Sequence, residues 1–174
     1  MKIIAFGASS SKKSINKKLA TYVVSLLKGF EVEVLDLNDY ELPLFSEDKE
    51  AEIGQPALAK QFMEKIGDSR GLVISFAEHN GSYSAAYKNL FDWCSRINPK
   101  VFQNKSMVLL STSPGPGGAA SVLAAAINST PYFDGDVKAS VSVPSFYENF
   151  DIEAGVIKNK DINDQLANAV QSLV

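Results

Sequence analysis

The loop from Gly7 to Asn16 is the first part of the chain whose residue types could bind a charged ligand. It follows a short apolar segment and precedes one with helical periodicity, so its backbone N–H groups would lie at a helix N-terminus, where anions are favoured. We therefore predict a phosphate-binding loop, the alternative being a solvated turn in which Ser14 only caps the helix. The side chains that could contact a phosphate are Ser9, Ser11, Ser14 and Asn16, with positive charge from Lys12 or Lys13.

A second candidate loop directly follows a predicted buried strand and contains Gly81, which lets a backbone turn sharply or approach a flat ligand closely. His79 or Tyr83 could stack on such a ligand. Glu78 or Asn80 could hydrogen-bond the edge of a heterocycle. The plainer interpretation is a tight turn that carries a surface histidine.

The third candidate is the loop Ser111–Ala119, which is rich in glycine and proline. Glycines before a helix of small residues are typical of a loop whose backbone N–H groups face a ligand. The alternative is a flexible connector with no role in binding.

The elements that must position these loops alternate between strands and helices. The predicted strands are Lys2–Phe6, Glu31–Asp36, Leu72–Ala77, Ser106–Ser111 and Val137–Val143. The predicted helices are Ile15–Leu27, Pro56–Ser69, Tyr87–Ile97, Ala119–Ile127 and Asp161–Leu173, and Leu37–Gly54 is expected to be a loop. This alternation predicts one α/β domain over residues 1–174, with three layers around a parallel five-stranded sheet. Because ligands bind beyond the carboxyl ends of parallel strands, we expect all three candidate loops at that edge.

Composition excludes several other classes of protein. The chain of 174 residues has 17 Lys and Arg against 20 Asp and Glu, so no nucleic-acid partner is expected. Cys94 and His79 are its single cysteine and histidine, which leaves neither an internal disulfide nor a His/Cys zinc site. No signal peptide is predicted, and Pro114–Gly118 interrupts the long uncharged stretch, which argues against a membrane helix. We expect a soluble cytoplasmic protein with no metal and no membrane partner.

Two further residues have structural interpretations. Cys94 lies on the apolar face of its predicted helix beside Leu90 and Ile97, so we predict that it packs in the core. Asp36 ends the second predicted strand, where dinucleotide-binding domains place an acid that binds ribose. The first loop, however, matches neither G-x-G-x-x-G nor G-x-x-x-x-G-K-[ST], so neither a dinucleotide nor a nucleoside triphosphate has its sequence signal.

The chain resembles the NADPH-dependent FMN reductase family over nearly its whole length. Its segment Glu78–Trp93 resembles the family pattern P-E-Y-N-G-S-x-x-x-x-L-K-N-x-x-D-W in order and spacing. The first loop resembles the family's G-S-x-R-x-x-S-x-N, with Ser9, Ser14 and Asn16 in register. The residues Asp36-Leu37 and Leu42-Pro43 resemble its D-L…L-P turn, and the departures are Ser11 for the arginine, Ala77 for the proline and His79 for the tyrosine.

This resemblance implies a flavodoxin-like fold with strand order 2-1-3-4-5 and FMN as cofactor. It implies an FMN phosphate on Ser9–Asn16 and a flavin ring between Glu78–Ser82 and Ser113–Gly118. The cofactor-binding residues that it implies are Ser9, Ser11, Ser14, Ile15, Asn16, Ala77, Glu78, His79, Asn80, Gly81, Ser82, Ser113, Pro114, Gly115 and Gly118.

The activity implied by the resemblance is a ping-pong transfer of hydride from NAD(P)H, through flavin N5, to a small acceptor. The acceptor would be a flavin, quinone, azo compound or metal oxyanion, and no side chain is implied as catalytic because the flavin carries the redox chemistry. Family members commonly form homodimers or homotetramers. Two alternatives stay open on the sequence: an electron carrier of flavodoxin type, and a flavin-free interaction protein on the same fold.

Overall fold

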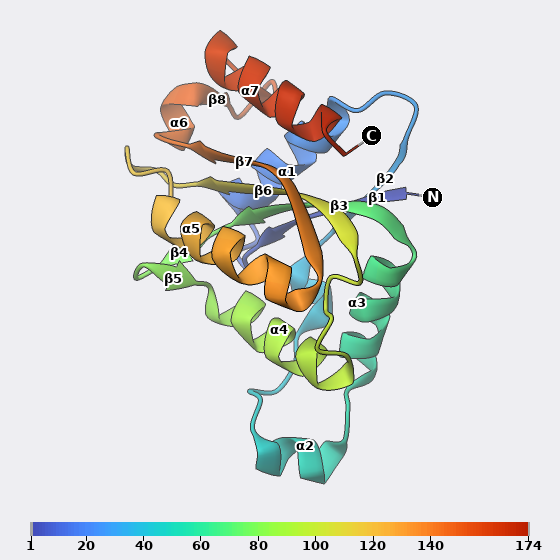
Figure 1. The fold of residues 1–174 in the computed structure, drawn as a ribbon. Coiled ribbons are helices and arrows are strands. Elements are labelled where there is room, and N and C mark those ends of the chain that lie inside the picture. Colours follow the sequence, from blue (N-terminus) through green and yellow to red (C-terminus); the bar gives the residue numbers. More distant parts are fainter. Residues whose placement is uncertain (1, 174) are drawn as a thin grey trace.

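A parallel sheet forms the centre of the computed structural model, which describes residues 2–173 (Figure 1). Within these residues the sheet has five strands in the order β2-β1-β3-β6-β7, and each neighbouring pair is parallel. Their bounds are β1 Lys2–Ala8, β2 Glu31–Leu35, β3 Ser69–Phe76, β6 Lys105–Thr112 and β7 Gly135–Val143. Counted along the sheet alone, this is the predicted order 2-1-3-4-5, which is confirmed.

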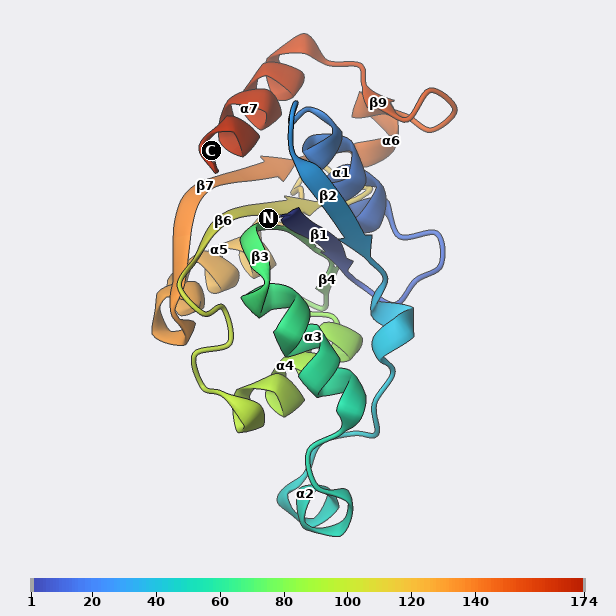
Figure 2. The ribbon, with the colours of Figure 1, turned by 90° about the vertical axis from the view of Figure 1, so that its right-hand side faces the viewer.

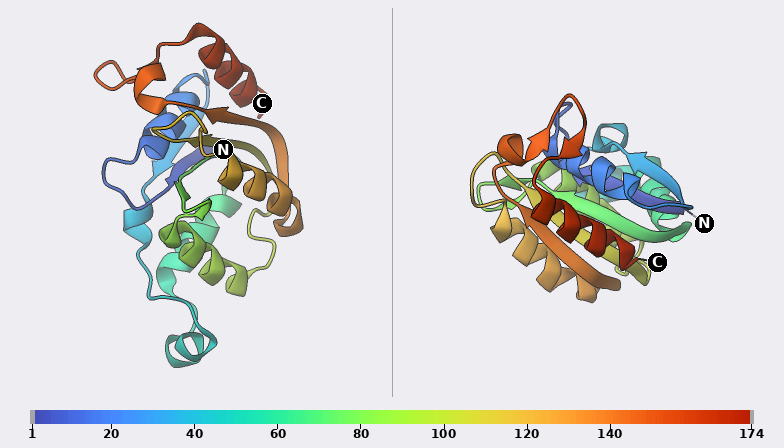
Figure 3. Two further views of the ribbon diagram at one scale, coloured as in Figure 1. Left: turned by 90° about the vertical axis from the view of Figure 1, so that its left-hand side faces the viewer. Right: turned by 90° about the horizontal axis from the view of Figure 1, so that it is seen from above.

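Helices cover both faces of the sheet. The longer ones are α1 Ile15–Ser25, α3 Ala57–Gly67, α4 Ala85–Ile97, α5 Ala120–Ser129 and α7 Lys160–Gln171. Figure 1 shows α1 and α7 on one face and α3, α4 and α5 on the other, and α1 and α7 lie across the same face when the molecule is seen from above (Figure 3). The predicted three-layer arrangement is therefore confirmed.

The apolar run at the start of the chain shows why the central strands are hydrophobic on both faces. Ile4 and Phe6 belong to the core beneath α3, α4 and α5, whereas Ile3 and Ala5 belong to the core beneath α1 and α7. Successive side chains of a strand point to opposite faces, so a central strand covered on both faces needs apolar residues at every position. Cys94 is fully buried in the first of these cores, as predicted.

The expectation of a structureless loop over residues 37–54 is wrong, because this segment contains two short helices. They are the 3-10 helix η1 Leu37–Tyr40 and the helix α2 Glu47–Ile53, which projects from the body of the molecule (Figure 2). The hydroxyl oxygen of Ser46 accepts a hydrogen bond from the backbone N–H of Lys49 and caps α2. Acidic residues fill the first turn of α2 and complement its dipole, so the helix forms although none of its residues is buried.

Several small elements also escaped prediction from the sequence. They are the strands β4 Glu78–His79 and β5 Ser82–Tyr83, the 3-10 helix η2 Thr130–Phe133, the helix α6 Phe146–Asn149, and the strands β8 Phe150–Asp151 and β9 Val156–Ile157. The pair β4–β5 forms one hairpin and the pair β8–β9 another. Among residues 2–173, every helix is too short or too polar to cross a membrane.

Candidate functional site

The three candidate loops meet at one edge of the sheet. In the register of the parallel strands, Ala8 of β1 lies beside Phe76 of β3, and Phe76 lies beside Ser111 of β6. The chain leaves these three neighbouring strands at the same end, as expected for a ligand site in an open parallel sheet. A pocket of about 230 Å³ lies there.

Most of the residues named from the sequence line this pocket. The predicted residues in its wall are Ser9, Ser11, Ser14, Ile15, Asn16, Ala77, Glu78, His79, Ser113 and Pro114. The predicted residues outside its wall are Asn80, Gly81, Ser82, Gly115 and Gly118. The wall also contains Lys13, one of the two lysines considered as a source of charge, and Thr112, which belongs to the third candidate loop. It contains Tyr147 as well, which the sequence did not indicate.

The first loop packs tightly against the start of α1. A Cβ atom at Gly7 would lie 2.3 Å from the backbone nitrogen of Lys17, so only glycine allows the strand and the helix to approach so closely. The backbone N–H groups of Ile15 and Asn16, in the first turn of α1, find no acceptor among residues 2–173. They give the pocket the anion-favouring end of a helix.

The serines of this loop keep their hydroxyl protons available. The Ser14 oxygen accepts from the Lys17 backbone N–H at 3.1 Å, and the Ser9 oxygen accepts from the Ser11 backbone N–H at 3.2 Å. Both side chains are buried, and neither hydroxyl donates to an acceptor among residues 2–173. A hydroxyl has one proton to donate in addition to its lone pairs, so both serines retain a donor for a ligand oxygen.

Asn16 holds the loop in place through its side chain. Its Nδ2 donates to the Thr112 carbonyl at 3.2 Å, and its Oδ1 accepts from the Thr112 N–H at 3.1 Å and from the Ser75 hydroxyl at 2.7 Å. The sequence predicted that this amide would donate to phosphate. In the structure it joins the ends of β3 and β6 to the start of α1, so its contribution to the pocket is to position the loop.

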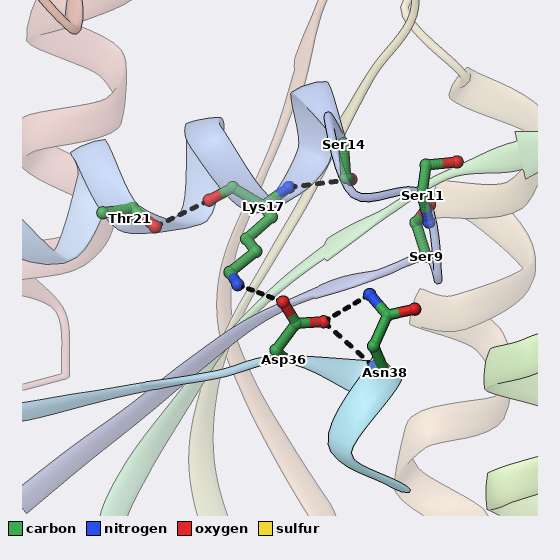
Figure 4. Close-up of polar contacts among 7 residues, drawn as sticks. All are labelled: Ser9, Ser11, Ser14, Lys17, Thr21, Asp36 and Asn38. Atoms are coloured by element: carbon green, nitrogen blue, oxygen red, sulfur yellow. Dashed lines mark hydrogen bonds and ion pairs between the residues drawn. The ribbon is translucent and has the colours of Figure 1, made fainter. Parts of the chain in front are cut away.

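Asp36 forms an ion pair with Lys17 beside the first loop (Figure 4). The Lys17 Nζ lies 2.5 Å from the Asp36 Oδ2, and the Asp36 Oδ1 accepts from both nitrogens of Asn38. The hydrogen bond from Lys17, followed by that from the Asn38 backbone, lowers the pKa of the Asp36 carboxyl. Asp36 therefore caps η1 and neutralises Lys17, which leaves Lys12 and Lys13 as the unpaired cations of the loop among residues 2–173.

The second loop is the hairpin β4–β5, and its turn lies at the surface. Asn80 and Gly81 form the turn, with φ of 54° and 76°, the left-handed region in which an Asn-Gly pair is favoured. The Glu78 carboxylate accepts from the backbone N–H of Val122 at 2.9 Å, so it caps the first turn of α5 rather than facing solvent. His79 is exposed at the rim of the pocket, and the hairpin is held at its other end by a contact between Tyr83 and Ser129.

The glycines of the third loop serve mainly to attach this loop to β7 and to the segment that follows β7. A Cβ at Gly118, where φ is +58°, would lie 2.3 Å from the Ser142 hydroxyl oxygen of β7. The Gly118 carbonyl accepts from the hydroxyls of Ser111 and Ser142, and the Gly115 carbonyl accepts from the backbone N–H of Ser145. The part of the loop that borders the pocket is therefore its start, Ser113 and Pro114.

Tyr147 reaches the pocket from α6, after the last strand of the sheet. Its neighbour Phe146 is fully buried, and the backbone N–H of Phe146 donates to the Ser113 carbonyl at 3.0 Å. These contacts fix α6 against the third loop and leave the Tyr147 side chain 58% exposed above it. A four-residue helix is too short to show a periodic pattern of apolar residues in the sequence, so no signal pointed to this residue.

Comparison with known proteins identifies the family. The sequence profile described as NADPH-dependent FMN reductase matches residues 1–146. The chain belongs to this family. The resemblance noted from the sequence is confirmed, and the family is one of oxidoreductases, so the electron-carrier and flavin-free alternatives are not favoured.

Two relatives show how far the similarity extends. The chain is 31% identical over 125 residues to an NADPH:quinone oxidoreductase of Arabidopsis thaliana, which covers 70% of this chain and 62% of the relative. It is 34% identical over 122 residues to a 2-hydroxy-1,4-benzoquinone reductase of Burkholderia sp, which covers 69% of this chain and 64% of the relative. The aligned part of the chain thus spans less than two thirds of the length of these relatives.

The solved structures extend the likeness of the fold over the whole chain. The flavoenzyme NAD(P)H:(acceptor) oxidoreductase FerB from Paracoccus denitrificans superimposes with a TM-score of 0.76, and the match covers 99% of this chain and 95% of FerB. Its sequence identity is 24%, so this likeness concerns the fold. The predicted flavodoxin-like fold is confirmed.

Proposed function

We propose that this chain is an FMN-dependent oxidoreductase that uses NAD(P)H to reduce a small acceptor. The observation that carries the proposal is the pocket at the carboxyl edge of the sheet, where a helix N-terminus and free hydroxyl donors converge. Such a site suits a phosphate group attached to a larger molecule that extends beyond the loop.

The residues present suit the phosphate end of FMN. The backbone N–H groups of Ile15 and Asn16 and the hydroxyls of Ser9 and Ser14 lack acceptors among residues 2–173 and line one pocket. Lys13 lies in the same wall and carries no ion pair among those residues, so it replaces the positive charge that the family pattern places at position 11. Together these groups would satisfy the oxygens of a phosphate dianion through charge-assisted hydrogen bonds.

The other walls of the pocket suit the sugar chain and the ring. Ala77 and His79 form one wall, Ser113 and Pro114 another, and Tyr147 adds an aromatic side chain at the rim. The pocket of about 230 Å³ is smaller than a usual small-molecule site, about 300–1,000 Å³, so the ring would extend past it towards the hairpin. When bound, FMN supplies the redox chemistry by accepting hydride and passing electrons to the acceptor. We propose as cofactor-binding residues Ser9, Ser11, Ser14, Ile15, Asn16, Ala77, Glu78, His79, Asn80, Gly81, Ser82, Ser113, Pro114, Gly115 and Gly118.

We propose a quinone as the acceptor class. The support comes from the two relatives described above, which are named as a quinone oxidoreductase and a benzoquinone reductase. A planar acceptor also suits the rim of the pocket, where the His79 side chain is exposed.

We also propose that residues 1–174 act as one domain that assembles into a homodimer or homotetramer in the cytoplasm. The single-domain proposal is supported by one sheet that takes strands from residue 2 to residue 143 and by α7 packing back on it. The assembly is supported by exposed apolar side chains at Leu44 and Ile53, beside and within the projecting α2. A buried, unpaired cysteine is in keeping with a reducing compartment.

The test begins with removal of any flavin, followed by titration with FMN and with riboflavin in a calorimeter. FMN is expected to bind at least a hundredfold more tightly than riboflavin, because about 3 kcal/mol of phosphate contacts is missing from riboflavin. The FMN-loaded protein is then mixed anaerobically with NADPH or NADH and afterwards with a benzoquinone. Flavin bleaching and its reversal by the quinone are expected, whereas bound FMN that neither nucleotide bleaches would indicate an electron carrier. Failure to bind FMN would contradict the proposal.

A further inference from the structure

A second hollow adjoins the phosphate loop on the side of α1 away from the hairpin β4–β5. It has a volume of about 580 Å³ and lies between α1 and the hairpin β8–β9, whose segments lie side by side in Figure 3. The rings of Tyr22 and Phe150 hold this junction together, edge to face, with centroids 6.0 Å apart. We call this hollow the basic groove.

The wall of the basic groove is positively charged. Its wall contains the four lysines Lys12, Lys13, Lys17 and Lys18, and no carboxylate occurs among the residues that form its wall within 2–173. Lys17 is neutralised by Asp36, but the other three form no ion pair among those residues. In a chain of net charge -3, three uncompensated lysines around one hollow favour an anionic ligand.

The far wall of the basic groove is apolar. It is formed by Phe150 and Ile152 of the hairpin β8–β9, and Ile152 is 45% exposed. An exposed β-branched side chain opposite a row of lysines offers a flat organic group a surface to lie on while its charged part stays near the ammonium groups. Inorganic phosphate or a purely ionic polymer would contact the lysines of the groove but not its apolar side chains.

The basic groove and the phosphate pocket share part of their walls. Lys13 and Ser14 line both of them, so the two hollows meet at the residues that would hold a phosphate. A ligand that has one phosphate in the loop can therefore reach the basic groove only if a further group is attached to that phosphate. The volume of the basic groove lies within the range of small-molecule sites, about 300–1,000 Å³.

We propose that the basic groove holds the adenylate half of FAD, so that this chain accepts the dinucleotide form of the flavin as well as FMN. The inference rests on the proposed flavin site. The second phosphate of FAD would lie among Lys12, Lys13 and Lys18, and its adenine would lie against Ile152. Lys18 is then a residue that distinguishes FAD from FMN, since it lines the basic groove and not the phosphate pocket.

The test compares the affinity of the flavin-free protein for FMN and for FAD by calorimetry, with the Lys18→Glu variant beside the parent. Lys18 is exposed on α1, where a glutamate leaves the fold intact. We expect FAD to bind as tightly as FMN or more tightly, and Lys18→Glu to weaken FAD about tenfold while FMN affinity stays unchanged. Lys28→Glu is the matched control, because Lys28 is equally exposed but lies outside both hollows, and it should change neither affinity.

Other outcomes overturn the inference in distinguishable ways. FMN binding without FAD binding would show that the basic groove is closed to adenylate, while the proposed function stands. A Lys18→Glu variant that raises the KM for NADPH in FMN-loaded protein, with FAD affinity unchanged, would assign the basic groove to the nicotinamide dinucleotide instead. If the parent protein binds neither FMN nor FAD, the proposed function itself is wrong.

Discussion

The two ends of the candidate flavin site are built in different ways. The phosphate end consists of buried side chains, because Ser9, Ser14 and Asn16 are each less than a tenth exposed. The hydrogen bonds of Asn16 join α1 to the ends of β3 and β6. The ring end is the hairpin β4–β5, whose turn is exposed and whose attachment depends on one carboxylate and one tyrosine. Under the proposed function the two ends would have different roles: the core would fix where the phosphate binds, whereas a surface turn would set what the ring meets. Rigid buried sites favour affinity through preorganisation, and exposed loops favour variation in specificity.

The largest expected effect comes from removing the centre of the phosphate end. Asn16→Ala leaves the Ser75 hydroxyl and the Thr112 backbone N–H and carbonyl without a buried partner, and should lower the free energy of unfolding by about 3 kcal/mol. Urea denaturation followed by circular dichroism measures this change. Asn168→Ala makes the same substitution at an exposed position of α7 and should change stability by less than about 0.5 kcal/mol. Equal effects at the two asparagines would mean that the side-chain hydrogen bonds of Asn16 do not hold the phosphate end together.

The next effect concerns affinity rather than stability. Ser9→Ala removes a hydroxyl that has a proton free for a phosphate oxygen, and should weaken FMN binding about tenfold. The affinity for riboflavin should stay the same, because riboflavin has no phosphate that could accept a hydrogen bond from Ser9. A parallel loss for FMN and riboflavin would mean that Ser9 acts on the ring end or on the fold as a whole.

A smaller effect is expected where the ring end is attached. Glu78→Ala removes the acceptor of the Val122 N–H and the negative charge at the start of α5, which should lower the free energy of unfolding by about 1 kcal/mol. Glu78→Gln keeps an acceptor and should lose less than half of that amount. Thermal unfolding compares the stabilities of the two variants directly. A glutamine variant that is destabilised as much as the alanine variant would show that the charge of Glu78, and not its geometry, holds the hairpin.

The smallest effect lies at the rim of the phosphate end and depends on pH. The pKa of the Asp36 carboxyl is lowered in the folded chain, mainly by Lys17, so its ion pair stabilises the fold above the ordinary carboxyl pKa of 3.8. This contribution should disappear as the pH falls from that value through the lower pKa of the folded state. Asp36→Asn should therefore reduce stability by less than about 1 kcal/mol at pH 7, because the pair is partly exposed, and by less at pH 3, which lies below the ordinary carboxyl pKa of 3.8. Urea midpoints at both pH values test the difference, and a gap that widens in acid would contradict it.

The contrast between the two ends also explains what could be predicted from the sequence. The strands of the sheet followed from apolar runs such as Leu72–Ala77, because a strand covered on both faces has a strong and local signal, whereas their order followed from the family resemblance. The residues of the phosphate loop followed from their position between strand and helix. Both depend on neighbours in the sequence, and both were found in the expected places.

What the sequence did not reveal depends on partners far along the chain. Asn16 could be named as a site residue, but its pairing with Thr112 joins residues 96 positions apart and leaves no periodic signal. Glu78 could be named with Asn80 as a group able to bond a heterocycle edge, but its hydrogen bond to a helix that begins 42 residues later gives no signal in the sequence. Tyr147 reaches the pocket from a single turn beyond the last strand of the sheet, which is fixed there by the buried side chain of Phe146 and by its backbone hydrogen bond to Ser113.

The burial of Cys94 bears on how the chain would withstand the compounds that it is proposed to reduce. Burial raises the pKa of this thiol to about 12, so at neutral pH the sulfur stays protonated and out of reach of solvent. Quinones are electrophiles that form covalent adducts with thiolates. A chain whose single sulfhydryl is shielded in this way presents no nucleophilic sulfur for such an adduct, and the same shielding slows its oxidation by peroxide formed at a reduced flavin.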